Sequence, residues 1–150
     1  MTHPQVVILG FDDWLAKQLQ EQATAAAWVL RDLRQVAACH AQLAEARPTV
    51  FVVQIDFQES TTALLALIAG VHASAPDVAI LVVGDVKLPE DDRIAWTLAA
   101  FDLGARFVLF PPLARPILED LVGGLMEATI RRTAPRAAPE TIDLAEEGQA

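Results

Sequence analysis

Short runs of branched and aromatic residues alternate along this chain with longer stretches in which apolar residues recur every three or four positions. This alternation is typical of a parallel β-sheet that carries helices on its faces. The runs at 5–9, 50–55 and 78–83 are almost continuously apolar, which indicates strands that are buried on both sides. The pattern predicts five strands, at 5–9, 28–31, 50–55, 78–83 and 107–110.

A helix is predicted after each strand, at 13–26, 33–46, 61–73, 90–103 and 114–132. In the fourth helix, Ile94, Leu98 and Phe101 form the stripe that we expect to face the sheet. A second apolar flank is expected to be exposed as an interaction face, or to pack at the rim of the last helix; it consists of Trp96, Ala100 and Leu103. From residue 133 the chain lacks periodic hydrophobic residues, so we predict one domain over 1–132 and a flexible acidic tail over 133–150.

The net charge of −9 and the absence of a basic stripe argue against direct binding of DNA or RNA. No apolar run approaches the ~20 residues that cross a bilayer, and no signal sequence opens the chain, so a soluble, cytoplasmic protein is expected. A glycine-rich phosphate loop is missing, since Gly10 stands alone after the first strand, and the single cysteine, Cys39, has no partner for a disulfide or a zinc site. We therefore expect no cofactor and no catalytic residues.

Two segments resemble the receiver (CheY-like) domain of bacterial response regulators in two-component signal transduction. They are RPTVFVV at 47–53, leading into the third strand, and GARFVLFPPL at 104–113, which is similar to the Gly-Ala, fifth strand, Lys-Pro-Phe pattern of that family. The resemblance covers residues 5 to 132. It implies a flavodoxin-like, three-layer α/β/α sandwich with a five-stranded parallel sheet in strand order 2-1-3-4-5. It also implies a cis peptide bond between Pro111 and Pro112.

Members of the family accept a phosphoryl group on an aspartate at the end of the third strand, with Mg²⁺ held by acidic residues after the first strand. On that pattern this chain has changed at every key position of the phosphoacceptor pocket. The degenerate pocket consists of Gly10 and Phe11 in place of the acidic pair, Gln54 in place of the acceptor, Val83 or Gly84 in place of the hydroxyl residue, and Pro111 in place of the lysine.

A shift of two residues in the third strand gives an alternative, in which Asp56 accepts the phosphoryl group and Mg²⁺ is bound at an acidic pocket. That pocket consists of Asp12, Asp13, Asp56 and Asp85, all near strand ends. In the simpler interpretation, Asp12 and Asp13 are an N-cap residue and a first-turn acid of the first helix, where a carboxylate accepts backbone N–H bonds and meets the positive end of the helix dipole.

The sequence therefore predicts a stand-alone pseudo-receiver that is not an enzyme. It would act through a protein partner or through self-association, on the face formed by the fourth helix, fifth strand and fifth helix. Two alternatives stay open: a response regulator phosphorylated at Asp56 with Mg²⁺, and a small-ligand sensor with a cavity lined by Phe11, Gln54 and Val83.

Overall fold

Five parallel strands form one central sheet in the computed structural model, which describes residues 3–55, 61–84, 88–114 and 116–137. The strands are β1 (Gln5–Leu9), β2 (Val29–Leu33), β3 (Thr49–Gln54), β4 (Ala79–Val83) and β5 (Phe107–Leu109). Their order across the sheet is β2-β1-β3-β4-β5, and every neighbouring pair is parallel. The predicted strand order is confirmed.

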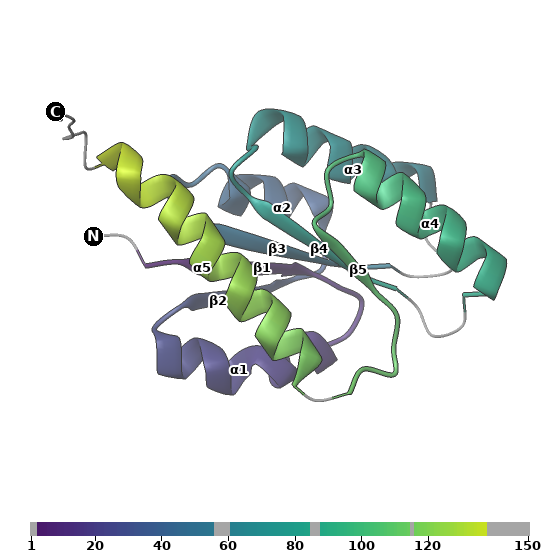
Figure 1. Cartoon of the computed structure of the whole chain (residues 1–150), viewed down its shortest axis with the longest axis horizontal. Coiled ribbons are helices and arrows are strands. Elements are labelled where there is room, and N and C mark those ends of the chain that lie inside the picture. Colours follow the sequence, from purple (N-terminus) through teal and green to yellow (C-terminus); the bar gives the residue numbers. More distant parts are fainter. Residues whose placement is uncertain (1–2, 56–60, 85–87, 115, 138–150) are drawn as a thin grey trace, which may run out of the picture.

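The helices complete a three-layer sandwich (Figure 1). They are α1 (Trp14–Ala26), α2 (Val36–Leu43), α3 (Thr61–Ser74), α4 (Glu90–Asp102) and α5 (Ile117–Ala137). Helices α1 and α5 cover one face of the sheet, and α2, α3 and α4 cover the other. Within the described residues, no helix combines the length and apolar character needed to cross a membrane.

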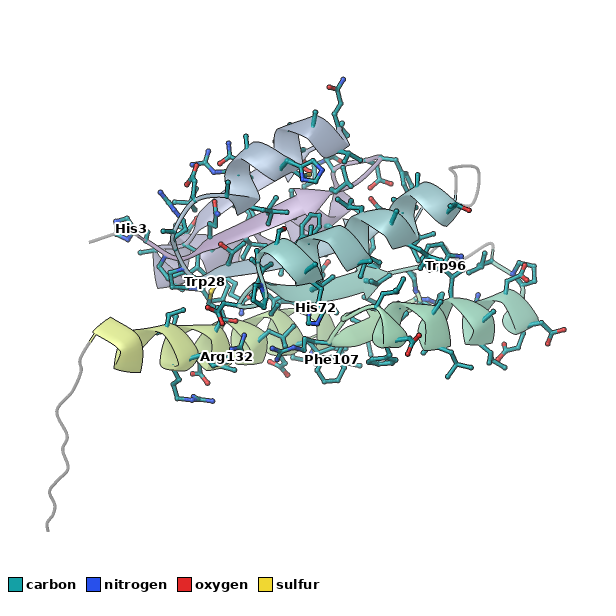
Figure 2. All side chains as sticks on the ribbon, turned by 90° about the horizontal axis from the view of Figure 1, so that it is seen from above. His3, Trp28, His72, Trp96, Phe107 and Arg132 are labelled. Atoms are coloured by element: carbon teal, nitrogen blue, oxygen red, sulfur yellow. The ribbon has the colours of Figure 1, made fainter. Side chains whose placement is uncertain are left out.

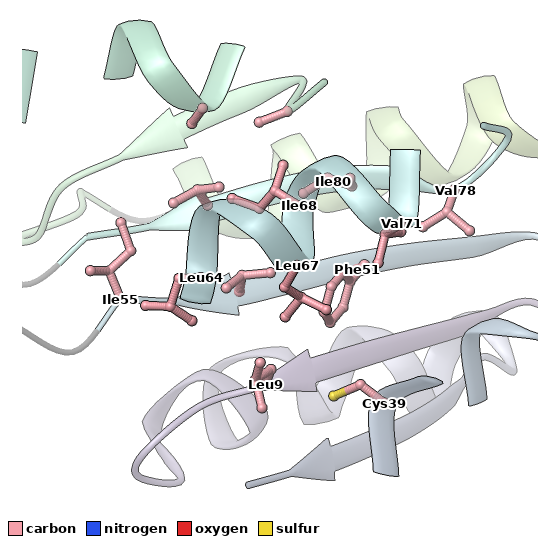
Figure 3. Packing of buried hydrophobic residues seen from close by; sticks show 14 of the residues in the cluster. Leu9, Cys39, Phe51, Ile55, Leu64, Leu67, Ile68, Val71, Val78 and Ile80 are labelled. Atoms are coloured by element: carbon pink, nitrogen blue, oxygen red, sulfur yellow. The ribbon is translucent and has the colours of Figure 1, made fainter. Parts of the chain in front are cut away.

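Two hydrophobic cores lie on either side of the sheet because successive residues of a strand point to opposite faces. In β3, Val50 and Val52 pack with residues of α1 and α5, whereas Phe51 and Val53 pack with residues of α2, α3 and α4. Figure 3 shows Phe51 beneath the residues of α3 that cover it. All residues of β1, β3 and β4 are buried, which explains why these strands carry almost continuous apolar runs.

The element boundaries differ from the sequence predictions mainly at the edges of the domain. Strand β2 lies at the edge of the sheet and is half-buried throughout, and it continues to Leu33, beyond the predicted end at 31. Helix α5 continues to Ala137, so the first five residues of the predicted tail are helical. The peptide bond between Pro111 and Pro112 is cis, as predicted.

Candidate functional site

The residues of the predicted pocket gather at the edge of the sheet where the parallel strands end. Gln54 is the last residue of β3, which is the register predicted from the sequence, and it pairs with Val83 at the end of β4. Gly10 directly follows β1, and Gly84 directly follows β4. Pro111 is the second residue after β5. Two members of the alternative acidic pocket, Asp56 and Asp85, lie outside the described residues.

The amide side chain of Gln54 closes the loop between β1 and α1. It is 6% exposed, its Oε1 accepts a hydrogen bond from the Phe11 backbone N–H at 3.1 Å, and its Nε2 donates to Asp12 Oδ1 at 3.4 Å. A side chain at position 10 would collide with this amide, because a Cβ there would lie 2.6 Å from Gln54 Oε1. Glycine at position 10 therefore allows the Gln54 amide to lie where it does, and a larger residue there would displace the end of that side chain.

The two acidic residues after β1 have different surroundings. Asp12 Oδ1 also accepts a bond from the Trp14 backbone N–H at 3.3 Å, so Asp12 caps the start of α1. Asp13 occupies the N-cap position without a capping bond from its side chain, and its Oδ2 lies 3.2 Å from Lys17 Nζ in an exposed pair. An acidic N-cap residue is therefore present, as the simpler interpretation predicted, but the bond to the start of α1 comes from Asp12, and the prediction of an acid within the first turn is wrong.

An aromatic ring occupies the space beside Gly84. A Cβ at this position would lie 2.2 Å from two ring carbons of Phe110, and the Gly84 N–H donates to the Leu109 carbonyl at 2.7 Å. The Arg93 guanidinium carbon lies 5.3 Å from the centre of the Phe110 ring, within the range of a cation–π contact. Phe110 and its neighbours thus fill the place after β4 where the resemblance predicts a hydroxyl side chain.

Arg34 is a cation of this edge that the sequence analysis missed. It directly follows β2, as Gly10 directly follows the adjacent β1, and it lines a cleft with Phe11 and Gln54. Its hydrogen bond with Asp32 raises the pKa of Arg34 above its ordinary value, and the charges of Asp12 and Asp13 act in the same direction. The signal was available, because residues that follow parallel neighbouring strands lie at the same edge of the sheet.

The cleft at this edge has a volume of ≈ 200 Å³ and is lined by Leu9, Gly10, Phe11, Arg34, Val36, Gln54 and Leu64. The predicted lining by Val83 is wrong, because Val83 is fully buried in the core under α1 and α5. Pockets for small molecules have volumes of ~300–1,000 Å³. The cleft is thus smaller than a usual ligand site. Among the described residues, no three His, Cys, Asp or Glu side chains are grouped closely enough to hold a metal ion.

The predicted orientation of α4 is wrong. Trp96 is 6% exposed and Ala100 is fully buried, and Leu103 packs against the same core as these two residues. The stripe that was expected to face the sheet is instead on the surface, since Ile94 is 56% and Leu98 67% exposed. Figure 2 shows Trp96 between α3 and α4, and Phe107 of β5 toward the outside of the molecule.

Comparison with known proteins identifies the fold. No family model and no curated protein matches the sequence. The signal receiver domain of an HD domain-containing protein from Pseudomonas fluorescens Pf-5 superimposes with a TM-score of 0.70 at 14% identity, over 90% of this chain and 95% of that one. The beryllofluoride-activated NtrC4 receiver domain dimer gives 0.66 at 13% identity, over 83% and 98%.

A third solved structure is the adenylate cyclase from Rhodopirellula baltica, with a TM-score of 0.69 at 9% identity, over 91% of this chain and 96% of that chain. Identities this low establish a shared fold and no shared activity. The chain has the fold of receiver domains, as the sequence resemblance predicted.

Proposed function

We propose that this chain is a pseudo-receiver, a signalling domain of the response-regulator type that is not phosphorylated, catalyses no reaction and acts by self-association. The observation that carries the proposal is the amide of Gln54 at the end of β3, bonded to the Phe11 backbone and to Asp12. An amide is not a nucleophile toward a phosphoryl group, whereas a carboxylate is.

The surroundings of Gln54 support the same proposal. Transfer of a phosphoryl group needs a metal ion and cations to balance the charge on the transferred oxygens. At this edge Asp12 Oδ1 is already engaged by Gln54 and by the start of α1. The ring of Phe110 lies against Gly84, Pro111 has no cationic side chain, and Arg34, the cation found at this edge, is paired with Asp32.

Treatment with a small phosphodonor such as acetyl phosphate and Mg²⁺, or with beryllofluoride, tests this proposal. We expect an unchanged intact mass and unchanged tryptophan fluorescence, for which Trp14 is a suitable reporter because its backbone N–H donates a hydrogen bond to Asp12 Oδ1. An Mg²⁺-dependent phosphoryl adduct on the wild-type chain that is lost in Asp56→Asn would overturn the proposal and establish the phosphorylatable alternative.

The surface for self-association, here called the α4–β5 patch, is formed by exposed apolar side chains on α4 and β5. Its members are Ile94 (56% exposed), Leu98 (67%), Phe101 (47%) and Phe107 (42%). Ile94, Leu98 and Phe101 follow one another at helical spacing, so they share one side of α4, and α4 packs on β5. Large apolar side chains grouped on a surface are typical of protein interfaces.

A second copy of this chain is the occupant that we propose for the α4–β5 patch. One solved structure with this fold is a receiver domain dimer, which supports that choice. The charge of −9 on each copy opposes association, and added salt screens this repulsion. Association should therefore strengthen as the salt concentration rises.

Sedimentation velocity over a range of protein concentrations tests the patch. The wild-type chain should shift from monomer toward dimer, Leu98→Glu should stay monomeric, and Val36→Glu should behave as the wild type because Val36 is exposed on α2, on a different part of the surface. A monomeric wild-type chain at every concentration, or equal effects of the two substitutions, would refute self-association through this patch. A monomer that binds a different protein through Leu98 would identify another partner.

A further inference from the structure

A second and larger depression lies at the opposite edge of the sheet, where β3 and β4 begin. This groove, here called the amino-edge groove, has a volume of ≈ 690 Å³. Its walls are the ends of α2 and α3, the segments that lead into β3 and β4, and the last turns of α5. The lining residues used below are Leu43, Ala44, Glu45, Arg47, Val71, Asp77, Val78, Thr129 and Thr133.

The chemistry of the amino-edge groove suits a short peptide. Leu43, Val71 and Val78 provide an aliphatic floor, and each is less than one-tenth exposed. Arg47 Nε and Glu45 Oε1 lie 3.0 Å apart as an ion pair, yet within the described residues both atoms are buried without an aligned hydrogen bond. These two atoms face each other and are covered by the protein, so what the groove offers a ligand is its aliphatic floor.

Helix α5 carries the end of the chain to this groove. Thr129 and Thr133 line it, and α5 ends at Ala137, four residues or about 6 Å of helix beyond Thr133. Residues 138–150 follow, with the sequence APETIDLAEEGQA. From Ala137 to Ile142 the chain can span at most about 17 Å, which is sufficient to turn back along the last turns of α5.

We propose that residues 138–150 of the same chain bind in the amino-edge groove, with Ile142 and Leu144 as the apolar anchors. In an extended segment these two side chains point to the same side, about 7 Å apart, while Asp143 between them points away. The tail has four carboxylate side chains and no Lys or Arg, whereas Arg47 in the groove is paired with Glu45 and Asp77 lies in the same lining. Apolar contact of the two anchors, and not charge, is therefore what would hold the segment.

The covalent connection favours this occupant over a peptide from another protein. A segment tied to its binding site by a few residues acts at an effective concentration in the millimolar range, so even weak contacts give substantial occupancy. The groove and the α4–β5 patch lie on different elements, so this proposal stands independently of the one for self-association.

A spin label at position 149 tests the binding of the tail directly. Gln149→Cys can be labelled selectively, because Cys39 is fully buried and burial raises the pKa of its thiol to about 11. The label should broaden the backbone amide signals of Val71, Val78 and Thr129 in nuclear magnetic resonance spectra. The amide signal of Gly10, at the other edge of the sheet, should keep its intensity.

The controls separate a docked tail from a freely moving one. Ile142→Ser with Leu144→Ser in the labelled chain should abolish the broadening at the groove, whereas Ala145→Ser should preserve it. Ala44→Glu places a carboxylate in the groove and should also reduce the broadening. Ala37→Glu, at an exposed position on α2 outside the lining, should leave the broadening unchanged. Broadening that persists in the double Ser variant would overturn the proposal. So would broadening that appears only between chains in a mixture, or at the α4–β5 patch.

Discussion

Gly84→Ala tests whether Phe110 occupies the space after β4. A Cβ at position 84 would lie 2.2 Å from two carbons of the Phe110 ring, whereas carbon atoms in contact are separated by about 3.5–4.0 Å. The ring must therefore move by more than about 1 Å in a largely buried environment, and overpacking of this kind costs about 1–3 kcal/mol.

The backbone itself does not oppose the substitution, because Gly84 is not among the residues with positive φ. Replacing a glycine by alanine in a compatible conformation stabilises a protein by about 0.4–1 kcal/mol through the unfolded chain. The expected net effect is a loss of about 1–2 kcal/mol in the free energy of unfolding. In a Phe110→Ala background the collision is absent, so the same substitution should stabilise the protein by about 0.4–1 kcal/mol.

Urea unfolding followed by tryptophan fluorescence measures all four chains of this double-mutant cycle. Gly70→Ala is the matched control, because Gly70 is exposed in α3 and nothing lies within 4 Å of a Cβ there. That substitution should stabilise by about 0.5–1 kcal/mol. The reasoning fails if Gly84→Ala stabilises the wild-type protein, or if it destabilises the Phe110→Ala variant equally.

Three further predictions concern the other sites. Trp96→Ala should lower the free energy of unfolding by about 3–5 kcal/mol because it empties a buried position, whereas Leu98→Ala should change it by less than about 0.5 kcal/mol; similar losses in urea unfolding would contradict the orientation of α4. Gln54→Glu should place a carboxylate against Asp12, which raises the pKa of the new carboxyl in the folded state. The variant should therefore be less stable than the wild type at pH 7 and regain stability as the pH falls through that pKa, and equal deficits at pH 7 and pH 4 would exclude this repulsion. Cys39 should react with a thiol reagent slowly in the folded chain and rapidly in urea, because burial raises its pKa to about 11; rapid labelling without urea would contradict its burial.

The order and pairing of the elements could be predicted because several independent signals in the sequence agree. Apart from Gln5, Thr49 and Gln54 at strand ends, β1, β3 and β4 are apolar at successive positions, as expected for strands with helices on both sides. The end of β3 at Gln54 was also predictable, and with it the presence of an amide side chain at the end of this strand. Local hydrophobic pattern was sufficient for these features.

The orientation of α4 was not predictable in this way. Ile94, Leu98 and Phe101 recur at the same helical spacing as Trp96, Ala100 and Leu103, so both sides of the helix are apolar and periodicity cannot choose between them. The choice depends on which side chains fill the space above the sheet beside α3, and Trp96 does so.

The sequence and the tertiary structure each determined a part of the pocket at the strand ends. The sequence alone determined the residue types at the strand ends, among them an amide at Gln54 and a proline at Pro111. The tertiary structure decided what surrounds these positions: the Gln54 amide lies against Gly10, the Phe110 ring lies against Gly84, and Arg34 lies beside the loop after β1. These contacts join residues far apart in the chain, and only packing across the sheet brings them together.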